Sequence, residues 1–142
     1  MINKPRVGYI CFGEVNTPIE RLRIMAREAK KSLSALNIEL IDAGIVIDDP
    51  DYKTANAAIE KLNGETFSSL IVCAAGWVPT HTVIKVTDVF RNLPILLWGL
   101  CGWRENGKII TTAGQAGTTA LRPAFEALDY RFKFVYSTIG QS

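Results

Sequence analysis

The sequence predicts an α/β fold in which five parallel strands form one sheet with helices on both faces. Apolar runs of strand length alternate along the chain with longer segments whose apolar residues recur every three or four positions. Within the runs, apolar residues follow one another without a break, which is typical of strands buried on both faces. Parallel strands need crossovers, and a crossover of this length is usually a helix.

The first half of the chain supplies three of these strands and two helices. The strands are expected at residues 6–13, 38–43 and 67–74. The first helix begins at Thr17-Pro18, which suits an N-cap followed by proline, and stops near Asn37. The second opens with Asp49-Pro50 and ends at Gly64. The apolar stripes expected on these helices are Ile19, Leu22, Ala26, Ala29, Leu33 and Leu36, then Tyr52, Ala55, Ile59 and Leu62.

The second half supplies the remaining two helices and two strands. A third helix begins after Pro79, turns Val83, Val86, Phe90 and Leu93 inward, and closes at Asn92 and Pro94. Strands are expected at residues 94–99 and 131–136, the second followed at once by a polar tail. Residues 100–107 carry two glycines and no period, which predicts a loop, and residues 109–111 either add a short strand or extend that loop. The final helix covers part of residues 118–128, where Pro123 requires a late start or a kink.

These elements make a flavodoxin-like, doubly wound domain over residues 1–142. The handedness of crossovers and the frequency of the fold favour strand order 2-1-3-4-5. The chain is 48% hydrophobic and 21% charged, within the globular range and long enough for its own core. A net charge of +2 gives no support for a nucleic-acid partner.

Several features bear on where the protein works. The apolar runs are too short to span a membrane, and residues 1–6 lack the apolar segment of a signal peptide. Cys11, Cys73 and Cys101 are widely spaced and form no C-x-x-C pair, so neither a disulfide framework nor a zinc site is indicated. We interpret Cys11 and Cys73 as small buried apolar residues of strands. A reducing cytoplasm fits this pattern.

The candidate binding site lies where the first and third strands end. Ligands of open parallel sheets bind beyond the carboxyl ends of the strands, at the point where the strand order reverses. In the expected order this point lies between these two strands, so we expect the residues that follow them to converge. They provide an aromatic platform, a carboxylate, and neutral hydrogen-bonding groups, which together suit a sugar. The candidate substrate-binding residues are Glu14, Asn16, Trp77, Thr80 and His81.

Each of these assignments has a structural alternative. Trp77 could instead cover the end of the sheet as packing. His81 is better explained as an exposed or capping residue of a helix start than as a catalytic group, because no partner is spaced to orient it. Carboxylates could hold a metal, but helix capping explains those at the second helix equally well, and no metal-ligand spacing appears. The carboxylates considered are Glu14, Asp42, Asp48, Asp49 and Asp51.

Other families of sites receive little support. Residues 114–119 are glycine-rich and precede a helix, so their backbone N–H groups could cradle an anion, but they lack a P-loop Gly-Lys-Ser/Thr, and a flexible turn is the simpler interpretation. No G-x-G-x-x-G follows the first strand. A receiver domain needs an Asp at the end of the third strand, where this chain has Ala74-Ala75-Gly76.

The strand motifs resemble those of a known family. RVGYICFG, IDAG, SLIVCAAGW, PILLWG and LDYRFKFVY, in this order, are similar to the N-terminal domain of the L-fucose isomerase and L-arabinose isomerase family. The resemblance covers nearly the whole chain, and its most specific parts are Gly76-Trp77 and the segment from Pro94 to Gly99. It departs from the L-fucose isomerases after the first strand, where they carry arginines and this chain has residues 13–16, GEVN, so the sugar is left open.

The resemblance implies that the chain contributes to an isomerase activity but does not catalyse the reaction by itself. Members of the family interconvert aldoses and ketoses in the cytoplasm through an enediol, with a divalent metal that is typically Mn²⁺. They are longer, three-domain proteins that assemble as oligomers, and their metal ligands, acid and base lie in later domains. The resemblance therefore implies an N-terminal domain, inactive alone, that contributes substrate contacts such as Trp77 to a pocket, often that of a neighbouring subunit.

Two other function classes remain open from the sequence. A non-catalytic module that binds or senses a small ligand such as a sugar would use the same fold and the same loops. A flavin or nucleotide binder would need a Ser-, Thr- and Gly-rich loop after the first strand, and Glu14 in that loop would repel a phosphate.

Overall fold

A computed structural model describes residues 4–111 and 113–139 of the chain. The strands lie in the order β2-β1-β3-β4, and β6 adds to the free side of β4, which confirms the predicted order with β6 as the fifth predicted strand. These strands are mutually parallel. Their bounds are β1 (Arg6–Phe12), β2 (Glu39–Val46), β3 (Ser69–Ala74), β4 (Ile95–Glu105) and β6 (Phe132–Ile139).

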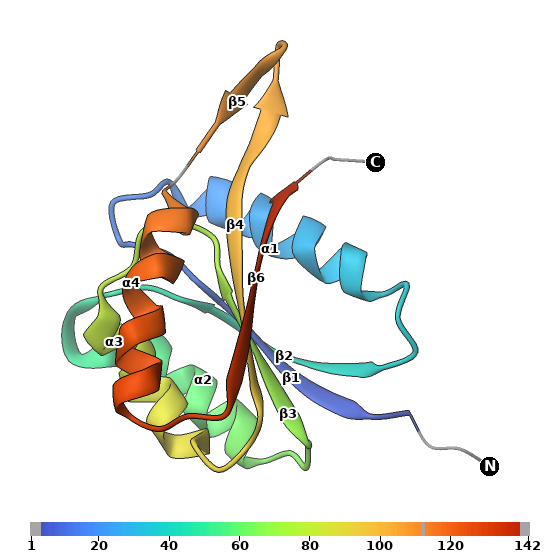
Figure 1. The fold of residues 1–142 in the computed structure, drawn as a ribbon, viewed down its shortest axis with the longest axis vertical. Helices are drawn as coiled ribbons and strands as arrows, with labels where there is room; N and C mark the ends of the chain where they lie inside the picture. Colours follow the sequence, from blue (N-terminus) through green and yellow to red (C-terminus); the bar gives the residue numbers. More distant parts are fainter. Residues whose placement is uncertain (1–3, 112, 140–142) are drawn as a thin grey trace.

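One further strand makes the sheet mixed rather than wholly parallel, contrary to the prediction. Strand β5 (Lys108–Ile110) runs antiparallel to the end of β4. Trp103 pairs with Ile110 on one side and with Ile139 on the other, so β5 occupies the same side of β4 as β3, beyond the end of β3. The β4–β5 hairpin stands away from the body of the molecule (Figure 1).

Helices cover both faces of the sheet, as predicted, but unequally. In the described part of the chain, α1 (Ile19–Leu33) packs alone on one face, which we call the α1 face. The opposite face, the covered face, carries α2 (Lys53–Asn63), α3 (Thr80–Thr87) and α4 (Gly114–Ala127) (Figure 1). Single 3₁₀ turns, Pro50–Tyr52 and Asp88–Phe90, precede α2 and follow α3.

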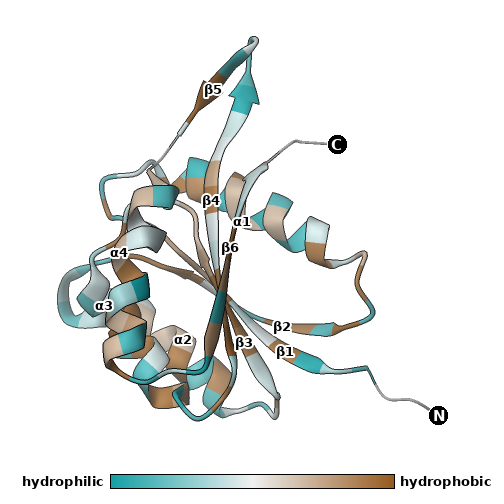
Figure 2. Ribbon diagram, in the orientation of Figure 1, coloured by the Kyte–Doolittle hydropathy of each residue, from teal (hydrophilic) through white to brown (hydrophobic). Residues whose placement is uncertain are grey.

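Alternating residues of each strand form two separate cores. Ile10, Val72 and Leu97 point to the covered face and meet Leu62, Val83 and Phe125 from its helices. Their strand neighbours, such as Cys11, Cys73 and Trp98, point to the α1 face and meet Leu22, Met25 and Ala29. Apolar colouring accordingly gathers along the central strands (Figure 2). Cys11 and Cys73 are buried, as predicted.

The largest departure from prediction is the segment after Gly99. Residues 100–107 were expected to form a loop, yet β4 continues to Glu105 and turns back at Asn106 and Gly107, whose φ angles are 51° and 75°. Two successive positive φ values are the mark of the tight hairpin turn that Asn-Gly favours. The two-residue alternation expected of a strand is missing from this segment because Gly102 has φ 133° and the β4–β6 register shifts between Leu100 and Trp103.

Helix boundaries differ from the prediction at several ends. Helix α1 ends at Leu33 rather than near Asn37. Of the residues expected on its apolar stripe, Ile19 is exposed, and Leu36 is exposed beyond the end of the helix; Met25 is buried instead. Helix α2 begins at Lys53, because Asp49-Pro50 leads into a 3₁₀ turn first. Helix α4 begins at Gly114, earlier than expected, and Pro123 lies within it. Strand β6 runs to Ile139, three residues into the segment that was expected to be a polar tail after the strand.

Candidate functional site

The loops after β1 and β3 leave the sheet side by side, as the strand order predicts. Phe12 and Ala74 are register partners at the ends of these strands, and the Ala75 N–H donates to the Phe12 carbonyl over 2.8 Å. The Gly13 N–H donates to the Val46 carbonyl of β2 over 3.1 Å. Three carboxyl ends are therefore joined in one rim, and all five candidate residues lie on the two loops or the helix start that leave it.

At Trp77 the backbone is packed within the protein and the side chain is exposed. Gly76 and Val78 on either side of it are buried, while Trp77 is 41% exposed. Helix α4 packs on this loop so closely that a Cβ added at Gly117 would lie 3.1 Å from the Gly76 carbonyl oxygen. The backbone at Trp77 is therefore packed on α4, and its indole is exposed beside the rim. The prediction that this residue faces the rim is consistent with that position, and its ligand role stays a prediction.

The indole N–H groups of the other two tryptophans are hydrogen-bonded to side chains within the protein. The indole N–H of Trp98 donates to the Ser137 hydroxyl over 2.6 Å, and that of Trp103 donates to a Glu105 carboxylate oxygen over 3.0 Å. No hydrogen bond or ring contact of this kind engages the Trp77 side chain within the described residues. Of the three tryptophans, Trp77 is the most exposed, because Trp98 is buried and Trp103 is half-buried.

Glu14 and Asn16 lie together in the loop after β1. The Glu14 carbonyl accepts the Thr17 N–H over 3.1 Å, and the Val15 N–H donates to an Asp48 carboxylate oxygen over 2.6 Å. The loop is thereby fixed to the segment after β2. The Glu14 side chain is half-buried and Asn16 is exposed.

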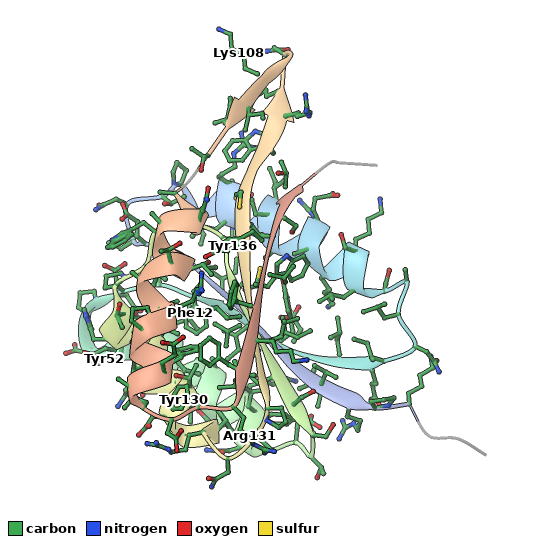
Figure 3. All side chains as sticks on the ribbon, viewed as in Figure 1. Phe12, Tyr52, Lys108, Tyr130, Arg131 and Tyr136 are labelled. Carbon is green, nitrogen blue, oxygen red and sulfur yellow. The ribbon has the colours of Figure 1, made fainter. Side chains whose placement is uncertain are left out.

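Thr80 and His81 open α3 above the end of β3. Thr80 is half-buried, whereas His81 is exposed and its ring lies edge-on to Tyr52, with ring centroids 6.1 Å apart. Lys85 lies over the same tyrosine ring at 5.4 Å, and Tyr52 projects at the outer side of the molecule (Figure 3). His81 is thus exposed at a helix start, as its structural alternative predicted, and its described ring contact is with Tyr52.

The structure brings the five residues into two groups. Glu14 and Asn16 form one, and Trp77, Thr80 and His81 form the other, on neighbouring loops. No hydrogen bond or ring contact links the two groups among residues 4–111 and 113–139. A ligand large enough to bridge two adjacent loops would be needed to use all five, and this convergence stays a prediction.

Three of the five carboxylates considered as metal ligands, Asp42, Asp48 and Asp49, make contacts within the loops or with a helix start. Asp42 contacts Lys30 at 3.1 Å and accepts the Gly44 N–H, and Asp48 accepts the Val15 N–H. Asp49 caps α2, accepting the Thr54 hydroxyl at 2.6 Å and the Thr54 N–H. Desolvation of Asp49 opposes its ionisation, but these hydrogen bonds outweigh it and leave the pKa of the carboxyl lowered. In the described residues no three His, Cys, Asp or Glu side chains are grouped to share a metal.

The glycine-rich segment 114–119 is the first turn of α4 rather than a flexible turn. A Cβ at Gly114 would lie 2.2 Å from the Leu100 carbonyl oxygen and 2.8 Å from that of Ala74. The glycines therefore let the helix approach the ends of β3 and β4, and the Thr118 hydroxyl donates to the Gly114 carbonyl. Close packing explains the composition of this segment without an anion.

Burial disfavours the thiolate form of two of the cysteines. Burial raises the pKa of the Cys73 thiol well above its ordinary value, and that of Cys101 is also raised by burial. A raised pKa keeps a thiol protonated and unreactive at neutral pH.

A second feature of the rim was missed by sequence reasoning. The Arg21 guanidinium of α1 lies 4.1 Å from the centroid of the Trp103 ring and 3.8 Å from a Glu105 carboxylate oxygen. This clamp ties the base of the hairpin to the first turn of α1, beside a hollow of about 370 Å³ lined by Thr17, Pro18, Glu20, Arg21, Ile24 and Trp103. Lys108 marks the distant tip (Figure 3). The Asn106-Gly107 pair was the available signal for this hairpin.

Comparison with known proteins adds no assignment: no protein-family model matches the chain, and no curated protein matches it either. Within the described residues, no helix combines the length and apolar character needed to cross a membrane.

Proposed function

We propose that this chain is the substrate-contacting N-terminal domain of a metal-dependent aldose–ketose isomerase and is inactive alone. The observation that carries the proposal is the exposed Trp77, fixed between buried Gly76 and Val78 where the strand order reverses. Its support from sequence is the ordered set of strand motifs that resembles the L-fucose and L-arabinose isomerase family.

In this role the rim supplies binding and orientation rather than proton transfer. The Trp77 indole would stack on the apolar face of a sugar, and the Asn16 amide and Thr80 hydroxyl would hydrogen-bond its hydroxyl groups. Glu14 would accept hydrogen bonds from the same hydroxyls. Such contacts fix which face of the sugar is presented to the reacting groups.

The implied metal is not assigned to residues of this chain. Asp42, Asp48 and Asp49 are engaged in loop and helix contacts, and no group of three candidate metal ligands occurs among the described residues. When bound elsewhere in the enzyme, the divalent metal would polarise the sugar carbonyl and hydroxyl. Cytoplasmic location and oligomeric assembly belong to the same proposal.

The experiment records the three indole N–H signals by ¹H–¹⁵N NMR while L-fucose or L-arabinose is added to the chain. Each signal is assigned by a Trp→Phe variant. We expect a saturable shift of the Trp77 signal and none at Trp98 or Trp103, whose indole N–H groups are hydrogen-bonded within the protein. Glycerol at equal concentration is the control. Equal shifts at all three indoles, or none at Trp77, would count against the proposal.

The alternative function is a non-catalytic sugar-binding or sensing module. The absence of a metal-ligand group within the described residues fits it as well. The gene separates the two: the isomerase proposal requires a reading frame that continues past Ser142 into a region rich in Glu, Asp and His. In that longer product, Trp77→Ala should raise KM for the sugar more than it lowers kcat. A stop codon directly after Ser142 would favour the binding module.

A further inference from the structure

Part of the α1 face, over Leu96 of β4 and Lys133 and Val135 of β6, has no helix over it in the described residues. Helix α1 covers Tyr9 and Cys11 of β1, and beyond it lies a hollow of about 570 Å³ at the amino ends of β1, β3, β4 and β6. Register pairs Ile71 with Leu96 and Leu96 with Lys133, so these side chains share the α1 face. The residues that line this hollow include Val7, Ser69, Ile71, Leu96 and Lys133.

The apolar surface continues from this hollow toward the carboxyl end of the sheet. Val135 follows Lys133 on the same face of β6, pairs in register with Trp98, and is 42% exposed. Parallel sheets occur almost only with both faces covered, because their strands are apolar on both sides. The covered face satisfies this rule with three helices, and the α1 face does not.

We propose that the open part of the α1 face docks an amphipathic helix of a partner polypeptide. The helix would lie beside α1 and antiparallel to β6, as the helices α1 to α4 each return from a carboxyl end to an amino end of the sheet. Its apolar stripe would cover Leu96 and Val135.

Charge sets the direction of this helix and its chemistry. Lys133 stands at the amino end of β6, and no ion pair engages it among the described residues. The C-terminus of an antiparallel helix would fall at this end, where its partial negative charge and any acidic side chain meet the lysine ammonium. Arg131 lies at the same end of the molecule (Figure 3), where its guanidinium donates to the Asn92 carbonyl over 2.7 Å. The occupant is therefore a helix with an apolar stripe and an acidic last turn.

A second copy of the chain fits this surface poorly. If helix α1 of another copy entered the hollow, it would bring the exposed basic residues Arg23, Arg27, Lys30 and Lys31. Those charges would be buried against Leu96 and repelled by Lys133. Edge-to-edge pairing of two β6 strands would extend the sheet and leave the hollow open.

The test uses a synthetic helical peptide of about 16 residues with leucines spaced three and four apart and glutamates in the last turn. The chain is labelled with ¹⁵N, and peptide-induced shifts are mapped. We expect saturable shifts at the amides of residues 69–71, 95–98 and 132–135, with little change on the covered face. A scrambled peptide of equal composition should produce none, and lysines in the last turn should weaken binding.

Matched variants make the outcome decisive. Val135→Glu should weaken peptide binding about tenfold, because a charge would enter the apolar contact. Val89→Glu places the same change at a similarly exposed site (49%) after α3 and should leave the affinity within about twofold. Lys133→Glu should reverse the preference between acidic and basic last turns. Circular dichroism verifies that each variant is folded.

Two results would overturn the proposal. One is the lack of shifts on the α1 face, or equal shifts with the scrambled peptide. The other is a dimer in sedimentation equilibrium that Val135→Glu dissociates and Val89→Glu does not, because the occupant would then be a second copy. The readout does not involve sugar, so failure here leaves the sugar-contact proposal for the rim intact.

Discussion

The two faces of one sheet differ although the same strands build both. On the covered face, three helices bury a continuous core of large apolar side chains, including Phe12, Leu97 and Phe125. On the α1 face, one helix buries Tyr9, Cys11 and Cys73, and the sheet beyond it opens into a hollow. Stability is therefore expected to come chiefly from the covered face, while the α1 face keeps surface for contacts with other molecules.

The sharpest test of this difference is a pair of neighbouring leucines. Leu97 is fully buried on the covered face, and Leu96 is half-buried on the α1 face. Leu97→Ala should lower the free energy of unfolding by about 2–5 kcal/mol, because it leaves a cavity among packed neighbours. Leu96→Ala should cost about 1 kcal/mol or less, since little packed volume is lost. Urea unfolding followed by circular dichroism measures both, and equal losses would erase the proposed difference.

The N-termini of α1, on the α1 face, and α2, on the covered face, also differ. Neither helix has a side-chain hydrogen bond at its N-cap residue, Tyr52 in α2 and Pro18 in α1. In the first turn of α2, however, the Thr54 N–H and hydroxyl donate to the Asp49 carboxylate, four residues before the helix begins. Asp49→Ala should cost about 0.5–2 kcal/mol of unfolding free energy. Because the folded-state pKa of Asp49 is lowered, its contribution is present above the unfolded pKa of about 4 and is lost as pH falls through the folded value.

The pH dependence supplies its own control. Stability of the unmodified chain, measured by urea midpoint between about pH 6 and pH 2, should fall with a steeper slope than that of Asp49→Asn. Asp51→Asn, at an exposed carboxylate in the adjacent turn, is the matched control for the loss of one negative charge. Parallel slopes for Asp49→Asn and the unmodified chain would contradict the cap.

The smallest expected effect concerns the clamp between α1 and the hairpin. Arg21→Ala should change the free energy of unfolding by about 1 kcal/mol or less, since the ion pair and the cation–π contact are partly exposed. The hairpin itself should open more often, so trypsin should cleave faster after Arg104 and Lys108. Arg27→Ala, on the same helix, is the control. Unchanged cleavage would mean that pairing with β4 alone holds the hairpin.

Strand order and the position of the rim were predictable because both follow from the alternation of elements. The extension of β4 was not, because Gly102 and the register shift near Leu100 break the two-residue period. The start of α4 was missed for a related reason: Gly114 and Gly117 resemble loop glycines, but their role is close approach to carbonyl oxygens far away in sequence.

The candidate site was predictable to the level of loops and no further. Sequence order places Glu14 and Trp77 on adjacent loops because their strands are neighbours. Side-chain direction depends on tertiary contacts, and the edge-on contact of His81 with Tyr52 could not be deduced from either segment alone. Of the five residues, Trp77 has the clearest signal in both sequence and structure.

The Asn106-Gly107 turn has a consequence for the order of folding. It closes the β4–β5 pair over two residues, so this hairpin can form within microseconds of chain collapse. The parallel pairs of the sheet join residues tens of positions apart, such as Val7 with Ser69, and must wait for whole crossover helices to be placed. The element that projects furthest from the finished molecule is therefore expected to be among the first to acquire its local shape.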